Sequence, residues 1–583
     1  MIMKNMTRLA AILLIGGGMA MSSCDGIFED LAINPNQPSM DAYFTTPEAV
    51  NDAVMTLYGY ISTQRCLGAS GSKTQIIRGD EASSNSDYGK PGMYGSDLNA
   101  SYYTIEQPFT LMYTTASQAS YVIETIGNVD FTGEEELRDA YLGEAYFWRA
   151  FAHYYLLINF RQVCPIRQMP RNSADYVRAP EAPEAVWDFI QEDLANAKTY
   201  LPNKGYWTGD QAGRVTRGAA AALSGLCYLY RSGIETHYGT DKTTFYNEAV
   251  QEFDEIIKGT YGTYDLADDY SDNFDIAHEN NNDESILEIQ FLGDVENNTF
   301  NPGTATSGLA FDSRGLMFPG AGVGYEGVVH DWLYEEFVNS IDKDGCTDIR
   351  MFSTLMFDDQ KEEIHLHQDA NGDPIRLEGP GGWHWEDMYP PTDEAEGFAT
   401  VANQLAHPFK AGIKKGLDLS MPTLTNGDGS PRMTGVGAGT QEYVYNQPRA
   451  HGVNWRYLRF ADVLLMYAEA VLSGGQQGSL TPTQAVNRVR GRANMPDLDN
   501  VTMDDVKHER ILELSLEGHR FYDLLRWGEL ATRFQTLTRE DPNFKKFISA
   551  TDYEGFTTNK HEWLPIPINE INSNPNIKQN PGY

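Results

Sequence analysis

Cysteine is scarce in this sequence, with five residues among 583. Cys66, Cys164, Cys227 and Cys346 lie far apart along the chain, and no two cysteines form the Cys-x-x-Cys pair that is typical of zinc and redox sites. A small disulfide-bonded scaffold would show denser spacing. We therefore expect no zinc site and at most one or two disulfides.

Positive charge is scarce as well. There are 44 lysines and arginines against 82 aspartates and glutamates, which gives a formal net charge of −38. A surface of this sign repels the phosphates of nucleic acids and the anionic headgroups of membranes. The composition therefore argues against nucleic-acid binding and against membrane docking through a basic patch.

Long hydrophobic runs are missing, since no window after the amino terminus holds about 18 uninterrupted apolar residues. The amino terminus carries Lys4 and Arg8, a short apolar stretch at 9–20, and then Met21-Ser22-Ser23-Cys24. Small residues before a cysteine resemble the lipobox of bacterial lipoproteins, apart from Met21, where leucine is usual. We predict a signal peptide over residues 1–23 and a lipid anchor on Cys24, with a plain secretory signal as the alternative.

Helical periodicity is present towards both ends of the chain. Apolar or small residues recur every three or four positions along residues 137–155, 215–226, 245–256 and 458–472, which places them on one helix face. Paired helices with small residues at their contacts are typical of tetratricopeptide-like repeats. The sequence predicts a mainly α fold.

The middle of the chain, from about 260 to 455, loses this periodicity and is punctuated by glycine, proline, asparagine and aspartate. Two exceptions are residues 285–291, which read as a strand, and residues 329–341, which read as a short helix. Long loops on a rigid scaffold are where binding residues usually lie. We predict an irregular ligand-binding subdomain over this range.

Several blocks of the sequence resemble the SusD/RagB family of outer-membrane nutrient-binding lipoproteins. One of the most specific is Tyr457-Leu-Arg-Phe-Ala-Asp-Val-Leu-Leu-Met-Tyr-Ala-Glu-Ala470. The other blocks are residues 143–150, 163–165, 212–230, 282–290, 508–528, 564–567 and 579–583. Their order is preserved, and the resemblance extends from Cys24 to Tyr583.

The resemblance implies one SusD-like domain over residues 24–583. Its right-handed scaffold would carry four tetratricopeptide-like helix pairs, at about 45–260 and 455–530. It implies a lipid-anchored protein on the outer-membrane surface of a Gram-negative bacterium, which captures oligosaccharides and delivers them to a SusC-like TonB-dependent transporter. Some members take peptides instead. The resemblance implies no enzyme activity and no cofactor.

Glu509, Glu513 and Glu517 are spaced to share one helix face. A glycoside hydrolase needs two carboxyl groups about 5–9.5 Å apart, so these residues admit a rival hypothesis, a secreted glycan-degrading enzyme. The alternative is a structural network of ion pairs, for which Arg510, Arg520 and Arg526 are at hand in the same segment. We favour the structural alternative.

His365-Leu-His367 followed by Asp369 hints at a metal site, but no further ligand has diagnostic spacing. The stretch 369–373 begins like a calcium-binding EF-hand loop, yet Pro374 stands where that loop requires glycine. Neither a Gly-x-Ser-x-Gly nor a His-Glu-x-x-His motif occurs. We expect no metal and no cofactor.

Aromatic residues in loops are candidates for sugar binding, because a flat ring covers the apolar face of a sugar while polar side chains bind its hydroxyls. By position, the resemblance favours the residues Arg78, Asp80, Tyr94, Asn99 and Tyr325. Chemistry alone adds Trp383 and Trp385, which are flanked by glycines. The alternative is that such rings merely hold their loops in place.

Overall fold

The computed structural model describes residues 44–84, 94, 98–291, 311–312, 327–378, 384, 410–416, 450–540 and 555–583. Over these ranges the protein is mainly helical with a few short strands, which confirms the predicted fold class. A helix long and apolar enough to span a bilayer does not occur among the described residues. Cys66, Cys164, Cys227 and Cys346 are all free thiols.

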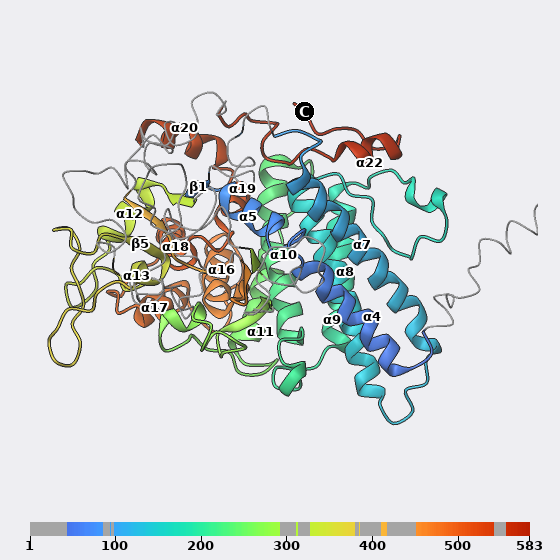
Figure 1. The fold of residues 1–583 in the computed structure, drawn as a ribbon, viewed down its shortest axis with the longest axis horizontal. Coiled ribbons are helices and arrows are strands. Elements are labelled where there is room, and N and C mark those ends of the chain that lie inside the picture. Colours follow the sequence, from blue (N-terminus) through green and yellow to red (C-terminus); the bar gives the residue numbers. More distant parts are fainter. Residues whose placement is uncertain are drawn as a thin grey trace, which may run out of the picture.

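A row of helices forms the scaffold, and each helix packs against the next in chain order. The row consists of α4 (Pro47–Ser62), α7 (Tyr103–Thr125), α8 (Glu135–Phe160), α9 (Pro183–Tyr200), α10 (Arg217–Tyr238), α11 (Tyr246–Ile257), α16 (Phe460–Leu472) and α17 (Pro482–Arg492). It continues from α11 to α16 although residues 258–459 separate them in the sequence. Figure 1 shows the row from blue α4 through green α10 to orange α16.

Helix α10 is central because its small residues let other helices approach closely. A Cβ at Gly225 would lie 2.5 Å from the ring of Phe253 in α11, and one at Gly233 would lie 2.4 Å from the carbonyl oxygen of Arg526. Arg526 belongs to α19 (Arg520–Trp527), which also packs on α10. The residues of the predicted stripe over 215–226 are buried.

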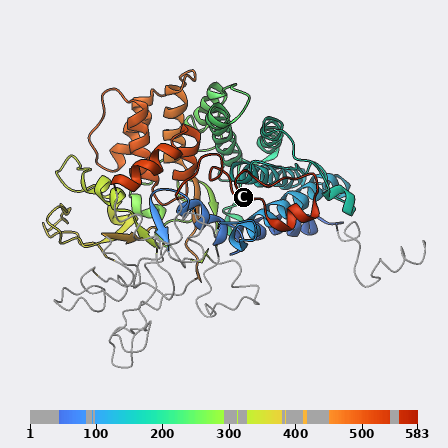
Figure 2. The same ribbon diagram turned by 90° about the horizontal axis from the view of Figure 1, so that it is seen from above.

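The described residues of the irregular middle contribute strands to three small antiparallel sheets and form two short α-helices. The largest sheet has the strand order β1-β4-β6-β5. Its strands are β1 (Ala82–Ser84), β4 (Gly327–Val329), β6 (Ala411–Ile413) and β5 (Leu355–Phe357). The helices are α12 (Asp331–Val338) and α13 (Arg350–Thr354), and α12 confirms the helix predicted in this range. In both views this part lies beside α16 and α17, at the end of the molecule away from α4 (Figures 1 and 2).

The other two sheets are two-stranded. The strand predicted at residues 285–291 is β2 (Ser285–Ile289), and it pairs with β8 (Trp455–Arg459), which leads directly into α16. The remaining ribbon joins β3 (Phe311–Asp312) to β7 (Ala450–His451). Both ribbons therefore connect the irregular middle to the chain just before the carboxy-terminal helices.

The carboxy-terminal segment returns to the amino-terminal half of the row. The amide of Leu564 donates to the carbonyl of Asn159, 2.7 Å away, and the side chain of Asn580 donates to the carbonyl of Phe160 at 2.9 Å. The side chain of Gln162 donates to the carbonyl of Lys578. The carbonyl groups of Asn159 and Phe160 at the end of α8 thus receive their donors from the carboxy-terminal segment. In the same segment, α22 (Ile568–Ser573) lies close to α7.

A buried charge network joins the irregular middle to the carboxy-terminal helices. Its members are Glu284, Asp348, Arg350, Lys415, Arg459, Arg490, Arg492, Glu509, Glu513 and Glu517. The three glutamates Glu509, Glu513 and Glu517 come from α18 (Met503–Leu514) and the turn after it. Arg350 and Lys415 come from the irregular middle, whereas Arg490 and Arg492 come from the end of α17, so the network includes residues from both parts.

The geometry of the network is that of arginine forks between carboxylates. Arg350 donates to Glu509 at 2.6 Å and to Glu513 at 2.8 Å, and Arg459 donates to Glu513 at 2.5 Å and to Glu517 at 2.9 Å. Such planar donors satisfy two carboxylates at once. Burial alone would raise the pKa of Glu517, but Arg459 and Lys415 lower it to about 2.

The predicted structural role of the three glutamates agrees with this geometry, but the predicted partners were wrong. Arg510 pairs with Asp462 and Asp523, Arg526 pairs with Glu469 and Asp523, and Arg520 pairs with Asp80. Arginines close in sequence to the glutamates therefore point to other neighbours. The actual partners come from segments that only the tertiary fold brings near.

Replacing Glu513 with glutamine should destabilise the protein strongly, because Arg350, Arg459 and Arg492 would lose a shared buried counter-charge. Removal of one partner from a buried ion pair costs about 3–5 kcal/mol. The free energy of unfolding from urea titrations measures this. As a control, Asp139→Asn removes an exposed pair with Arg138 and should cost about 1 kcal/mol or less. Equal stability of the two variants would contradict a supporting role for the network.

Candidate functional site

The four-stranded sheet is the place where the predicted ligand-binding segments start and end. Strand β1 follows Arg78 and Asp80, strand β4 follows Tyr325, and strand β6 follows the segment with Trp383 and Trp385. Ala82 pairs with Val329, and Val328 pairs with Gly412, so these strands are direct neighbours. Tyr325, Trp383 and Trp385 themselves lie outside the described residues. Segments distant in the sequence are thus attached to one small sheet, which we take as the candidate site.

Arg78 lies in the interior, where it is 1% exposed. Its guanidinium donates to the side chain of Asn159 at 3.0 Å and to the carbonyls of His561 and Glu562 at 3.2 and 3.1 Å. The group also stacks on the ring of Phe521, 3.8 Å from its centre. Arg78 therefore joins α8, α19 and the carboxy-terminal segment, and this position does not fit the predicted contact with sugar hydroxyls.

Asp80 is also fully buried and is bound by two arginines. Arg520 donates to its two carboxylate oxygens at 2.8 and 3.1 Å, and Arg533 of α20 (Leu530–Glu540) forms a further ion pair. Burial would raise the pKa of Asp80, yet the two arginines hold it well below its usual range. A carboxylate with these partners holds the start of the sheet in place and is not available to bind a ligand.

Tyr94 and Asn99 differ in exposure. Tyr94 is 1% exposed, its hydroxyl donates to the carbonyl of Arg78 at 2.5 Å, and its ring packs against Phe534 and Phe556. Asn99 is exposed and accepts a bond from the amide of Ser101 just before α7. Of the four described candidates, only Asn99 lies at the surface. The structure brings Arg78 and Tyr94 together, but as parts of the interior.

Trp332 is an aromatic residue of this region that was not predicted from the sequence. It lies at the start of α12, directly after β4, and it is only half-buried. Its indole donates to the carbonyl of Asp80 at 2.5 Å, and the guanidinium of Arg533 lies 4.4 Å from its ring centre. The helical pattern of residues 329–341 was the only available signal, and it did not distinguish Trp332 from a core residue.

The carboxylates suggested for a glycoside hydrolase are not available to a substrate. The side chains of Glu509 and Glu513 are 0% exposed, that of Glu517 is 4% exposed, and all three are ion-paired within the buried charge network. A catalytic acid and base must reach the glycosidic bond. This geometry argues against the hydrolase hypothesis for these residues.

Glu81 is a second buried acid at the start of the sheet. Its carboxylate accepts a bond from the amide of Leu516 at 3.2 Å. Burial, and then the nearby charge of Asp80, raise the pKa of Glu81 to about 8. Glu81 is therefore protonated in the folded protein at neutral pH, next to an Asp80 that stays ionised.

Glu81→Gln should change how stability depends on pH, because glutamine keeps the acceptor for Leu516 but cannot ionise. Between about pH 5 and pH 8 the unfolded parent is already ionised at this residue while the folded parent still binds the proton, so the parent loses stability as the pH rises. Its free energy of unfolding, measured relative to Glu81→Gln, should fall by roughly 2–4 kcal/mol over that range. Parallel pH profiles of the two proteins would contradict this.

Comparison with known proteins gives matches along most of the chain. Residues 283–583 match the model of the SusD family, and residues 33–229 match a model described as "Starch-binding associating with outer membrane". A SusD-like protein of Bacteroides ovatus is 24% identical over 523 residues, which cover 87% of this chain and 80% of that protein.

Solved structures share the fold. A SusD superfamily protein from Bacteroides vulgatus has a TM-score of 0.67 at 22% identity, covering 93% of this chain and 100% of its own. Surface glycan-binding protein A from Bacteroides thetaiotaomicron, solved in complex with laminarihexaose, has a TM-score of 0.63 at 18% identity, covering 92% and 100%. Since the SusD family model matches more than half of the sequence and these structures share its fold, the chain belongs to the SusD family.

Proposed function

We propose that this protein is a cell-surface glycan-binding lipoprotein, which captures oligosaccharides and delivers them to a TonB-dependent outer-membrane transporter. The observation that carries the proposal is the four-stranded sheet. Its neighbouring strands β1, β4 and β6 bear the ends of segments whose aromatic residues suit sugar rings. The family supports the same ligand class, because one structural relative is solved with laminarihexaose and another is named a laminarin-binding protein.

Within this proposal, the binding residues are Tyr325, Trp383 and Trp385, and Asn99 is a further polar candidate at the surface. Arg78, Asp80 and Tyr94 take a supporting role, because their side chains hold the beginning of the sheet from inside. A shallow surface of stacked rings holds a sugar chain without needing a catalytic pair. Capture without cleavage agrees with the burial of Glu509, Glu513 and Glu517.

The amino terminus supports attachment to a membrane through lipid on Cys24. Removal of residues 1–23 takes away Lys4 and Arg8 and no acidic residue, so the formal charge becomes 42 − 82 = −40. A body of this charge is repelled by anionic lipid while its acyl chains hold it near the surface. The transporter as partner rests on the resemblance to the family.

Alanine substitution of Tyr325, Trp383 or Trp385 should weaken glycan binding, because each change removes one stacking face. Burial of one face contributes roughly 1–3 kcal/mol, which corresponds to about a 5- to 150-fold change in affinity. Calorimetric titration with laminarihexaose and with starch oligosaccharides measures it, and melting temperatures should stay close to the parent. Tyr176→Ala, an exposed aromatic between α8 and α9, serves as the matched control.

Two outcomes would overturn the binding proposal. If the three loop variants bind as the parent does, the site lies elsewhere. If the parent releases reducing ends from either glycan, and Glu513→Gln abolishes this release without unfolding the protein, the chain is a hydrolase. Retention of both glycans without product formation supports capture.

Cys24→Ala should release the protein from membranes into the soluble fraction, because the lipid would be its anchor. Membrane fractionation of cells that express the full chain, together with mass spectrometry of the mature amino terminus, measures both consequences. Cys164→Ser, which changes a buried thiol, should leave membrane partitioning intact. An unmodified mature amino terminus with unchanged partitioning would refute the lipid anchor.

A further inference from the structure

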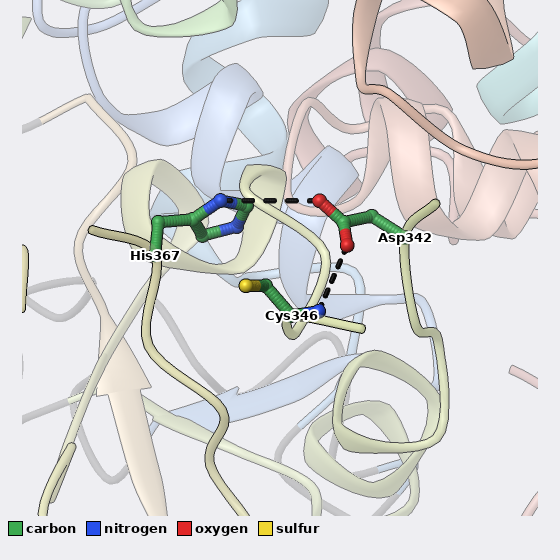
Figure 3. A group of neighbouring side chains, drawn as sticks. All are labelled: Asp342, Cys346 and His367. Carbon is green, nitrogen blue, oxygen red and sulfur yellow. Dashed lines mark hydrogen bonds and ion pairs between the residues drawn. The ribbon is translucent and has the colours of Figure 1, made fainter. Parts of the chain in front are cut away.

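Three potential metal ligands converge in the part of the chain between Tyr325 and Trp383. Asp342, Cys346 and His367 each offer one ligand atom, and these atoms lie within 4.8 Å of one another (Figure 3). Asp342 and Cys346 lie in a tight loop closed by the bridge between Ile341 and Thr347. His367 comes from a separate segment that runs alongside this loop.

Backbone hydrogen bonds fix the position of the histidine segment against the loop. The amide of Thr347 donates to the carbonyl of His365 at 2.8 Å, and the Nε2 of His367 lies 2.9 Å from the carbonyl oxygen of Thr347. A carbonyl oxygen can only accept, so Nε2 must carry the proton. In the neutral imidazole this leaves the lone pair on Nδ1, which faces Asp342.

The separation between the nitrogen and the carboxylate suits a shared ion. Nδ1 of His367 lies 3.9 Å from Oδ2 of Asp342, which is too far for a hydrogen bond. Zinc binds imidazole nitrogen and carboxylate oxygen at about 2.0–2.2 Å, so two such ligands on one tetrahedral ion lie about 3.4 Å apart. A shift of about half an ångström therefore brings both atoms into coordination distance.

The carboxylate of Asp342 is held in place from behind. Its Oδ1 accepts bonds from the amides of Asp344 and Cys346 at 2.9 and 2.8 Å, and its Oδ2 accepts from the side chain of Asn494 at 3.1 Å. The side chain of Asp342 is 0% exposed. In metalloproteins, hydrogen bonds from surrounding groups hold a ligating side chain in the orientation that the metal requires.

Cys346 completes the donor set with sulfur. Its amide is bound to Asp342, and its Sγ lies 3.5 Å from the carbonyl oxygen of Leu366, the residue before His367. The residue is partly exposed, so an ion and a water molecule can reach it. Sulfur, imidazole nitrogen and one carboxylate oxygen together favour zinc, whereas calcium and magnesium prefer sites made of oxygen alone.

We infer that Asp342, Cys346 and His367 bind one zinc ion, with water as the fourth ligand. The ion fastens the 342–346 loop to the segment with His367, and Asn494 orients Asp342 from the end of α17. Binding replaces the thiol proton of Cys346, which is released to solvent, by the metal. This site is independent of glycan capture.

A zinc ion here departs from two expectations, that the widely spaced cysteines form no zinc site and that His365, His367 and Asp369 bind no metal. His365 instead lies with its Nδ1 3.2 Å from the carbonyl oxygen of Gly345. Asp369 accepts the amides of Asn371 and Asp373 within its own turn. Only His367 of that group contributes to the cluster, and its two partners come from more than twenty residues earlier in the sequence.

Titration of the chelator-treated, full-length folded protein with Co²⁺ tests the site directly. We expect one equivalent to produce the visible bands of tetrahedral cobalt together with a thiolate-to-cobalt charge-transfer band, and zinc to displace it. Zinc should also raise the melting temperature. A parent protein without saturable bands, or whose melting temperature zinc does not raise, overturns the inference.

Substitutions then assign the ligands. Cys346→Ser should abolish the charge-transfer band, and His367→Gln should weaken zinc binding at least 10-fold. His365→Gln, a histidine two positions away, and Cys164→Ser serve as matched controls and should bind as the parent does. A charge-transfer band that survives in folded Cys346→Ser, or that is lost in Cys164→Ser, contradicts the assignment.

Discussion

The buried charge network is the constraint on which the arrangement of this protein depends. Arg350 and Lys415 from the irregular middle, and Arg459 from β8, pair with the buried glutamates of α18 and of the turn after it. An ion pair without water stabilises a contact only when its geometry is satisfied completely. The network thereby fixes how the loop-bearing part sits on the helical row. The four-stranded sheet is held by the same contact, because β5 follows the helix of Arg350 and β6 lies just before Lys415.

The helical row was predictable because its signal is local. Small and apolar residues at steps of three and four define each contact face, and they predicted α8, α10, α11 and α16 from the sequence alone. The partners of Glu509, Glu513 and Glu517 were not predictable in this way. Which arginine reaches a glutamate depends on where remote segments fold, and Arg350 lies far from α18 in the sequence.

At the candidate site, too, the sequence did not predict which partners individual side chains have. Arg78, Asp80 and Tyr94 have the chemistry of sugar-binding residues, but composition does not tell whether such side chains point outward or inward. Here Asn159, Arg520 and the carboxy-terminal segment provide interior partners for them. The cluster of Asp342, Cys346 and His367 was missed for a different reason, which is that its spacing in the sequence matches no known metal-binding motif.

The return of the carboxy-terminal segment to α8 has a consequence for how the chain is made. Asn159 and Phe160 receive their partners from Leu564 and Asn580, and Arg78 receives backbone acceptors from His561 and Glu562. These partners leave the ribosome last. The contacts that Arg78, Asn159 and Phe160 make with this segment therefore form only after the whole chain has been synthesised.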